Sequence, residues 1–353
     1  MTDPGHDGGR YVRTVSAERF FSSTCAERRA VPLPPADAEY AGLPAPYLAR
    51  VDNVTLVPAD WLLISAHDDL LVETLHHVPV PKLGRFAAVQ EVAGQVVKLR
   101  PPSREDSIAE PCILLGGHWS HYHWLVDYLP RVFAAGQFAD LRDLRFLVSR
   151  NLAPAQRQSL LLAGVGEERL LPLDDDAFYR IATLWVPSIF SRTGIVHPLV
   201  PRWLRQTYSD ALGSTGPRLR LFVSRRDAAR RKLLNETEIS AILEPLGFQT
   251  IVPGELSFED QVRTFARAEA IVAVTGSGLS NCVFAPRGCD VIELLNSADL
   301  STNTFNRNLA LLAGHRHRWF PGQPVFCEGE LPHNWDFRIE PDSFKMEMSR
   351  NRG

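Results

Sequence analysis

Residues 271–281 read Ile-Val-Ala-Val-Thr-Gly-Ser-Gly-Leu-Ser-Asn, an apolar run that breaks into a Gly-Ser-Gly turn. The apolar run predicts a buried strand, and Gly276 and Gly278 lack the Cβ atoms that would block a close ligand. Ser280 or Asn281 is placed to cap a helix that continues to Phe284. Free N–H groups at such a turn and helix start bind anions, most often phosphate. A tight connection without a ligand accounts for the turn equally well, so the flanking sequence must decide.

Strands and helices alternate on both sides of this turn. Apolar runs predict parallel strands over 219–223, 248–251, 271–274 and 291–294, with helices over 236–246, 258–270 and 280–284 between them. This alternation is typical of a Rossmann-like domain, in which ligands lie beyond the carboxyl ends of the strands. We therefore expect a C-terminal Rossmann-like domain over residues 199–353, with a tail that packs back on the first domain.

The first half of the chain has a different pattern. Short β-like runs between residues 50 and 99 predict a small sheet, and strands alternate with helices from residue 113 onward. One helix is expected from Tyr122 to Gly136, with a kink at Pro130. We expect an N-terminal α/β domain over residues 1–198 that opens with a loose leader to about residue 46.

Composition excludes several classes of function. The chain has 353 residues, 45% of them hydrophobic and 22% charged, and its formal net charge of −3 argues against a nucleic-acid binder. The five cysteines include no CxxC pair, which indicates buried thiols in a reducing compartment. Residues 1–10 lack the apolar core of a signal peptide, and no apolar run reaches the ~18 residues of a transmembrane helix. We therefore expect a cytoplasmic protein without a membrane span.

Several motifs occur in an order that identifies a family. They are His121–Arg131, Leu221–Arg226, Arg230–Glu236, Pro253–Gln261 and Phe284–Leu294. In this order and spacing, over about residues 110–295, the chain resembles glycosyltransferase family 61. That family includes bacterial capsule and lipopolysaccharide enzymes, plant xylosyltransferases and eukaryotic O-GlcNAc or GlcNAc transferases.

The resemblance implies a fold and a reaction. It implies two Rossmann-like α/β domains that face a cleft, the GT-B-like arrangement. It also implies an inverting, metal-independent transfer of a sugar from a nucleotide-diphosphate donor, a UDP-sugar, to a glycan or other hydroxyl acceptor, with no cofactor. A cytoplasmic bacterial enzyme of polysaccharide biosynthesis fits these expectations.

The chain departs from the family at one position of the turn. Family members often carry His-Gly-Ala-Gly where this chain has Thr275, Gly276, Ser277 and Gly278. The glycines keep the backbone cradle for phosphate. The Thr275 hydroxyl can donate a hydrogen bond, but it supplies no positive charge.

The donor site is predicted from residues near the ends of strands. Arg225 and Arg231 match the family's positions and can grip phosphate oxygens in a two-pronged geometry, although the surrounding run of basic residues reads as a solvated face. Glu293 either accepts hydrogen bonds from ribose hydroxyls or caps the next segment. Asn281 is a helix cap first and a donor contact second. With Thr275, Gly276, Ser277 and Gly278, these residues form the predicted donor site.

Catalysis requires a base that takes the proton of the acceptor hydroxyl. Asp127 falls on the family's aspartate and is the first candidate, and His123 lies four residues away, on the same face of a helix. A structural salt bridge from Asp127 to Arg131 is the competing interpretation. His121 and Trp124 are predicted to bind the acceptor, with Trp119 or Trp124 as a stacking platform, although buried tryptophans usually belong to a core.

Two other functions compete with the transferase. His118, His121 and His123 lie within six residues and invite a zinc site, and so a metal-dependent hydrolase, but no Asp, Glu or Cys completes a familiar spacing. The replacement of histidine by Thr275 favours a non-catalytic protein that binds a nucleotide or glycan. We predict no metal.

Overall fold

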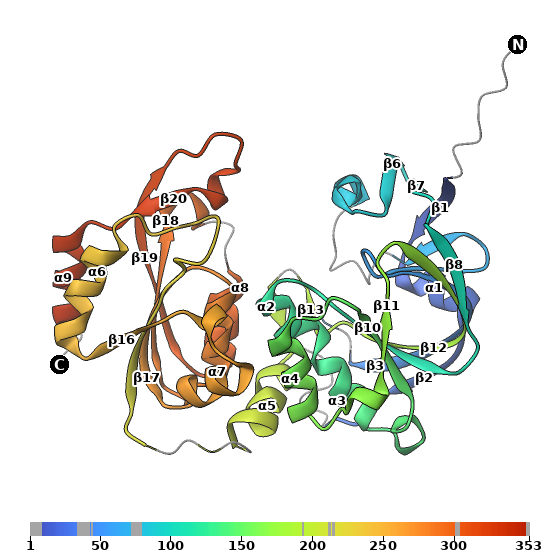
Figure 1. Ribbon diagram of the computed structural model, residues 1–353, viewed down its shortest axis with the longest axis horizontal. Coiled ribbons are helices and arrows are strands. Elements are labelled where there is room, and N and C mark those ends of the chain that lie inside the picture. Colours follow the sequence, from blue (N-terminus) through green and yellow to red (C-terminus); the bar gives the residue numbers. More distant parts are fainter. Residues whose placement is uncertain are drawn as a thin grey trace, which may run out of the picture. The chain divides into compact units, whose positions relative to one another are not determined.

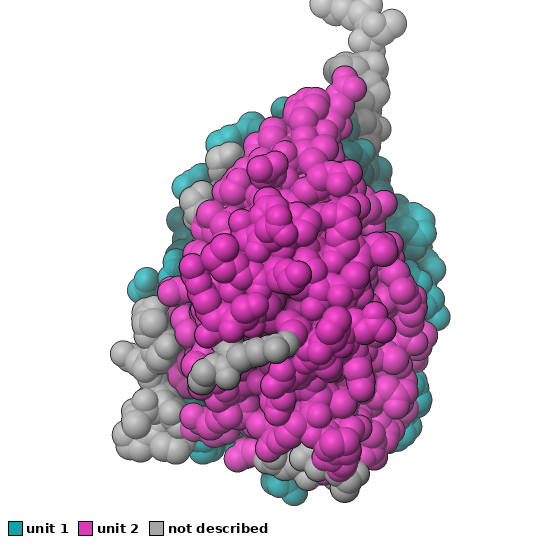
Figure 2. Space-filling model, turned by 90° about the vertical axis from the view of Figure 1, so that its left-hand side faces the viewer, with its two compact units in different colours: residues 1–119, 126–153, 164–193 teal, residues 120–125, 154–163, 194–353 magenta. Residues whose placement is uncertain are grey.

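The computed structural model describes residues 9–33, 43, 45–71, 80–192, 194–210, 213, 216–300 and 304–350. The chain divides into two compact units (Figure 2). Unit 1 comprises residues 1–119, 126–153 and 164–193, and unit 2 comprises residues 120–125, 154–163 and 194–353. Both units contain sheets and helices, which confirms the predicted α/β class (Figure 1).

Unit 1 is built on one large mixed sheet. Its strands are β1 (Arg10–Val15), β2 (Cys25–Ala30), β3 (Tyr47–Val57), β4 (Leu62–Ile64), β5 (Asp69–Leu71), β6 (Val89–Ala93), β7 (Val96–Leu99), β8 (Arg104–Ile108), β9 (Cys112–Gly116), β10 (Arg145–Ser149), β11 (Leu170–Leu173) and β12 (Ala177–Pro187). The order is β11-β10-β9-β12-β3-β4-β5-β1-β7-β6, with β2 beside β3 and β8 beside β12.

The sheet of unit 1 has a parallel part and a mainly antiparallel part. Strands β11, β10, β9 and β12 are parallel neighbours. From β12 onward, the pairs β12–β3, β3–β4 and β4–β5 are antiparallel. Only the parallel part follows the expected Rossmann-like pattern; in the rest, short connections join neighbouring antiparallel strands, which a doubly wound sheet lacks.

The helices of unit 1 are short. They are α1 (Ala17–Thr24), η3 (Val80–Arg85), α3 (Pro130–Gly136), η5 (Ala139–Leu141) and η6 (Glu167–Arg169), and the two-residue strand β13 (Ser191–Arg192) ends the unit. A core of apolar side chains from β1, β3, β4, β5 and β7 packs on one part of the sheet, with Val12, Leu62, Leu70 and Val97 among its members.

The expectation of a loose leader is wrong for the described residues before position 34. Residues 10–30 form β1, α1 and β2, and β1 pairs with β5 and β7. The physical reason is that buried Val12 and Thr14 alternate with exposed Tyr11 and Arg13 in a strand, while Phe20 and Phe21 give α1 a buried face. Residues 34–42 and 44 of the expected leader, and residues 1–8, lie outside the described residues.

Unit 2 is built on a six-stranded sheet with the order β16-β15-β17-β18-β19-β20. Its strands are β15 (Leu219–Val223), β16 (Phe248–Ile251), β17 (Ala268–Val274), β18 (Asp290–Asn296), β19 (Arg316–Val325) and β20 (Asp336–Arg338), and the short β14 (Ile195–Val196) precedes them. Every pair is parallel except β19–β20. The four predicted strands of this half are confirmed, and β16-β15-β17-β18-β19 follow a doubly wound parallel order.

Helices cover both faces of this sheet. The helical segments of unit 2 are α2 (His121–His123), α4 (Pro154–Leu162), α5 (Leu199–Leu204), η7 (Arg205–Asp210), α6 (Glu236–Leu243), η8 (Glu244–Leu246), η9 (Pro253–Glu255), α7 (Phe258–Phe265), η10 (Ser277–Phe284), η11 (Ser297–Asp299), α8 (Phe305–Leu312), η12 (Pro332–Asn334) and α9 (Pro341–Arg350). In Figure 1, α6 and α9 lie on one face and α7 and α8 on the other. None of the described helices is both long and apolar enough to span a membrane.

The C-terminal tail packs on unit 2, so the expectation that it returns to the first domain is wrong. Phe344 and Met348 of α9 join a buried cluster with Phe222, Ile239 and Phe337 from the same unit. Strand β20 pairs with β19 and so extends the sheet of unit 2. Apolar residues four apart on α9 give the helix one face that this sheet buries.

The expected helix from Tyr122 to Gly136 is also corrected. It is divided into α2, the π-helical turn η4 (Trp124–Tyr128) and α3, which begins at Pro130. Proline fits the first turn of a helix because it has no N–H to leave unsatisfied. π-Helical turns are uncommon and frequently occur at functional sites.

Candidate functional site

The predicted donor residues gather at the carboxyl edge of the unit 2 sheet. Strands β15 and β17 pair in parallel with Val223 opposite Ala273. Arg225 follows the end of β15 by two residues, and Thr275 and Gly276 follow β17 directly. Because parallel strands end at the same edge, this register brings the arginine and the glycine turn together.

The guanidinium of Arg225 lies against the backbone of Gly276. A Cβ atom added at Gly276 would overlap the Nη1 and Cζ atoms of Arg225. The φ of Gly276 is 162°, which is extended backbone, so the position needs glycine for space and not for conformation. The glycine therefore permits the close approach, but in this structure the group that approaches is a protein cation.

Arg225 and Arg231 form a pair of half-buried cations. Among the described residues, neither guanidinium has a carboxylate within ion-pair distance, and the Nε atoms of both are buried without a hydrogen-bond partner. Burial, followed by the charge of Arg231, lowers the pKa of Arg225 to about 10. Burial also lowers the pKa of Arg231, against the opposing effect of Asp299 and Glu293. Two half-buried cations that lie close together, each with an Nε atom that donates to no group of the described residues, create a site for an anion.

The neighbouring basic residues differ from this pair. Exposed Arg226 pairs with Glu255 at 3.2 Å, and exposed Arg230 pairs with Glu330 at 2.7 Å. The interpretation of a solvated charged face is thus confirmed for these two. Arg231 itself adopts a φ of 59°, a conformation that few non-glycine residues take, and its N–H donates to the carbonyl of Asn334.

Glu293 is fully buried and accepts hydrogen bonds from four side chains. Thr275 Oγ1 and Asn306 Nδ2 donate to its Oε1, each at 2.8 Å. Trp319 Nε1 and His317 Nε2 lie 3.2 and 3.1 Å from its Oε2. Protein side chains therefore contact both carboxylate oxygens of Glu293. This arrangement favours neither of the two predicted roles, a contact to ribose hydroxyls or a cap of the next segment. Sequence reasoning missed Asn306, His317 and Trp319 because no local motif marks them.

This network fixes the start of the glycine turn. Asn306 Nδ2 also donates to the carbonyl oxygen of Gly276 at 3.2 Å, and the N–H of Thr275 donates to Leu294 at 2.8 Å. The residue that stands in place of the family's histidine therefore donates its hydroxyl to Glu293. Thr275 is fully buried, so its side chain stabilises the turn from the protein interior.

The helix after the turn is a 3₁₀-helix that starts at Ser277. Its N-cap is Gly276, so the prediction that Ser280 or Asn281 caps it is wrong. The first N–H groups of a helix, here those of Ser277 and Gly278, have no partner within the helix. Gly278 faces Pro253, whose Cγ would lie 3.2 Å from an added Cβ. The turn thus has backbone donors in the two residues that follow Gly276, against which Arg225 lies.

Asn281 lies inside the 3₁₀-helix and joins two other elements. Its Oδ1 is 2.9 Å from His121 Nε2, and its Nδ2 donates to Gln261 Oε1 at 2.8 Å. Burial lowers the pKa of His121. Because an amide oxygen can only accept, His121 Nε2 is the donor in this contact. Asn281 is fully buried, which makes it a structural link between α2 and α7 in place of the predicted helix cap.

Trp124 is a core residue and not an exposed platform. Its side chain is fully buried and its Nε1 donates to Ser159 Oγ at 2.9 Å, so the predicted stacking role for Trp124 is wrong. Trp119, by contrast, is 91% exposed, and its ring stacks on His118 with centroids 5.3 Å apart. Of the two tryptophans considered, only Trp119 offers a face to solvent.

Asp127 lies in the π-helical turn and is buried. Ser191 Oγ donates to its Oδ1. The side chain of Arg131 donates to the main-chain oxygens of Asp127 and Leu115, at 3.2 and 2.9 Å. The segment continues from α2 directly into this π-helical turn, so the shared face expected for His123 and Asp127 stays a prediction. His123 packs edge-on against Tyr122 and Phe305.

His118, His121 and His123 do not come together as the ligands of a zinc site. Within the ranges that the structure describes, no group of three or more His, Cys, Asp and Glu side chains is arranged to hold a metal ion. His118 stacks on Trp119, and His121 contacts Asn281. The alternative of a hydrolase built on these three histidines therefore has no structural support.

Comparisons with known proteins agree with the motifs. The model of a family described as Glycosyltransferase 61 matches residues 121–292. An alpha-1,3-arabinosyltransferase of rice (Oryza sativa subsp. japonica) is 30% identical over 132 residues, which is 34% of this chain and 23% of that protein. A second rice alpha-1,3-arabinosyltransferase is 33% identical over 107 residues, 27% of this chain and 18% of its own length. The matched part spans less than a quarter of either relative. The family match and these two relatives place the segment His121–Ile292 of the chain in glycosyltransferase family 61.

Proposed function

We propose that the protein is an inverting glycosyltransferase that moves a sugar from a nucleotide-diphosphate donor to a hydroxyl acceptor. The observation that carries the proposal is a half-buried pair of cations, Arg225 against Gly276 and the neighbouring Arg231, with no carboxylate partner among the described residues. Family membership and the two arabinosyltransferases support the reaction class. We propose a UDP-sugar as donor and a glycan as acceptor, and so a place in cytoplasmic, bacterial polysaccharide biosynthesis.

The donor diphosphate would bind at the carboxyl edge of the unit 2 sheet. A leaving diphosphate gains negative charge as the sugar departs, and the rate depends on groups placed to stabilise that charge. Arg225 and Arg231 supply two guanidinium groups, and the N–H groups of Ser277 and Gly278 supply backbone donors. These charges need no metal ion, so we propose metal-independent transfer.

Glu293 would act on the donor through the turn and not by contact. Its carboxylate holds Thr275 and Asn306, and Asn306 holds the carbonyl of Gly276. This arrangement fixes the direction of the N–H groups that follow. We therefore propose Glu293 and Thr275 as positioning residues, and Asn281 as a link that holds His121 in its place.

The segment from Trp119 to Asp127, which contributes residues to both units, would supply the base and an acceptor surface. Asp127 is our proposed base, with Ser191 as its hydrogen-bond partner and His123 as the alternative. The exposed ring of Trp119 suits stacking on a sugar face, and His121 remains a proposed acceptor contact. In the GT-B-like arrangement that we propose, unit 1 and the segment 120–125 take the acceptor, and the sheet of unit 2 takes the donor.

Thermal unfolding with nucleotides tests the proposal. We expect one of UDP, GDP, CDP and dTDP to stabilise the protein with or without chelator, since a ligand at 100 times its Kd adds about 2.7 kcal/mol, a shift of several degrees. Arg225→Ala should abolish the shift. Arg226→Ala is the matched control because that side chain is exposed and paired with Glu255. Absence of a shift with every nucleotide would refute the donor site.

Turnover separates the transferase from a binding protein. A donor-derived sugar should appear on a glycan acceptor when the stabilising nucleotide's sugar conjugates are supplied. Because Thr275 replaces a family histidine, a non-catalytic nucleotide-binding protein is the second candidate. Binding of the donor without transfer or hydrolysis would favour that candidate.

A further inference from the structure

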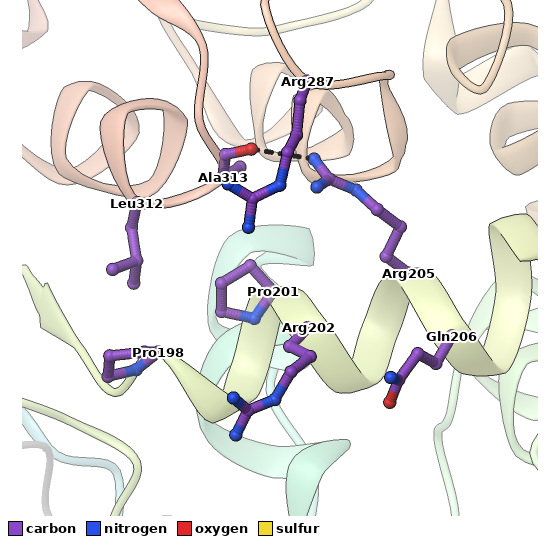
Figure 3. Close-up of a pocket in the computed structure, with 8 residues that line it drawn as sticks. All are labelled: Pro198, Pro201, Arg202, Arg205, Gln206, Arg287, Leu312 and Ala313. Carbon is purple, nitrogen blue, oxygen red and sulfur yellow. Dashed lines mark hydrogen bonds between the residues drawn. The ribbon is translucent and has the colours of Figure 1, made fainter. Parts of the chain in front are cut away.

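A cavity of about 290 Å³ lies in unit 2, far from the proposed donor site. Its walls include Pro201, Arg202, Arg205 and Gln206 from α5 and η7, Arg287 from the loop before β18, and Ala313 from the end of α8 (Figure 3). Arg287 precedes Asp290, the first residue of β18, so this is the amino-terminal edge of the sheet. Strand β18 has seven residues and separates the two edges by about 20 Å.

The lining carries three cations and no acidic residue. Arg287 is exposed and makes no hydrogen bond or ion pair with any residue in the part of the chain that the structure describes. Figure 3 shows its side chain extending toward Pro201, beside the guanidinium of Arg205. An exposed arginine would ordinarily turn toward water or an acid, whereas here it lies over a cavity with two other arginines.

Arg205 is held in place by the main chain. Its Nε donates to Val283 O at 3.2 Å, and its Nη2 donates to Ala285 O at 2.9 Å and to Ala313 O at 3.0 Å. These three hydrogen bonds fix the position of one positive charge in the lining of the cavity. A fixed charge binds an anion with less loss of side-chain freedom than a mobile one.

The positive field of this group reaches a buried neighbour. His315 is 5% exposed, and its pKa is lowered to about 4, first by burial and then by the charges of Arg205 and Arg287. Like charges held together raise the free energy of the site, and an anion between them would remove that repulsion. No acidic side chain of the cavity performs this role.

Size and chemistry define the class of ligand. A volume of 290 Å³ is at the small end of ligand pockets and has room for a phosphate ester but not for a complete nucleotide sugar. Guanidinium groups match phosphate oxygens in a two-pronged geometry, and Pro201 offers an apolar wall to the carbon atoms of an ester. We propose that this cavity, lined by Arg202, Arg205 and Arg287, is a second anion site that binds a phosphate-bearing group. The site does not depend on the proposed transferase function.

Calorimetric titration with two soluble probes, inorganic phosphate and sn-glycerol 3-phosphate, tests the proposal. The full chain carries Arg225→Ala throughout, so that the proposed donor site does not contribute. We expect Arg287→Gln and Arg202→Gln to weaken binding at least tenfold. Arg180→Gln is the control of equal charge change, because Arg180 is an exposed residue of unit 1 that pairs with Glu105 and does not line this cavity. Circular dichroism verifies that each variant is folded.

A vesicle arm distinguishes a soluble ligand from a lipid headgroup. Sedimentation with phosphatidylcholine vesicles that contain phosphatidic acid measures binding to a membrane phosphate. Loss of soluble-phosphate binding on Arg287→Gln, without vesicle binding, supports a soluble ester. Vesicle binding that the same variant abolishes supports a lipid headgroup. Binding that Arg287→Gln and Arg202→Gln leave unchanged, or no binding of any probe, overturns the site.

Discussion

The guanidinium of Arg225 occupies the space that a side chain at Gly276 would need. Arg225 and Gly276 are more than fifty residues apart in the sequence, yet they pack against each other in the fold. Neither residue alone indicates an anion site. The glycine makes the approach possible, and the approach places a cation beside the first N–H groups of a helix. This relationship turns a common strand-to-helix connection into a candidate anion site.

Gly276→Ala should remove nucleotide binding without unfolding the protein. The extended φ of 162° tolerates alanine, so the added methyl group acts by displacing Arg225. We expect at least tenfold weaker binding in calorimetric titration and little change in the Tm of the free protein. Gly136→Ala is the control, since a Cβ there meets nothing within 4 Å. Unchanged affinity in Gly276→Ala would show that Arg225 does not contact the ligand.

Glu293→Gln should destabilise unit 2 by about 2–4 kcal/mol. The side chain is fully buried and accepts from four donors, so an amide would set an N–H against two of them. Chemical unfolding measures the loss. The control is Glu269→Gln, an exposed strand residue whose pair with Arg220 is worth less than about 1 kcal/mol. Equal stability of the two variants would contradict the proposed buried network.

Stability should fall between about pH 6.5 and pH 4 because of His315. The pKa of His315 is lowered to about 4 in the folded chain, whereas an unfolded histidine titrates near 6.5. Above pH 6.5 both states are neutral, and below it the unfolded state alone takes the proton until about pH 4. Linkage then removes up to about 3 kcal/mol across this window.

The pH effect of His315 can be separated from that of other groups. His315→Gln keeps a donor for the carbonyl of Cys282, which His315 Nε2 now contacts at 2.8 Å, but it removes the titrating ring. The slope of unfolding free energy against pH should therefore flatten between pH 6.5 and 4. Exposed His333→Gln is the control and should keep the slope of the unaltered chain. An unaltered slope in His315→Gln would contradict the assignment.

Local patterns predicted the strands of unit 2 well. Strands β15 and β16 have the predicted bounds because their apolar runs are short, are bounded by turns and lie between helices of ordinary length. The same reasoning could not find β20, which has three residues and depends on pairing with β19. In unit 1, one sheet unites the short runs near residue 60 with the strands after residue 112, a long-range pairing that no local period reveals.

The candidate site was predictable only where the family motifs extend. Arg225, Arg231 and Gly276 lie within those motifs and meet at one sheet edge. Asn306 and His317 lie beyond them and reach Glu293 only after the sheet has formed. Trp124 was misjudged because residue type does not show which of two nearby tryptophans is buried. The fold decides that by placing Ser159 against the Trp124 ring nitrogen.

Asp127→Asn should separate binding from turnover. The variant keeps the size of the side chain and an oxygen that can accept from Ser191, so the π-helical turn is expected to persist. Loss of a general base lowers turnover by about 10²–10⁴-fold, while nucleotide affinity depends on unit 2 and should stay within twofold. Asp140→Asn, an exposed change at the surface pair with Arg29, controls for charge. If Asp127→Asn retained full turnover, the base would have to be another residue, and His123→Gln would be the next variant to measure. If both the affinity and the Tm fell, Asp127 would instead be a structural residue of the π-helical turn.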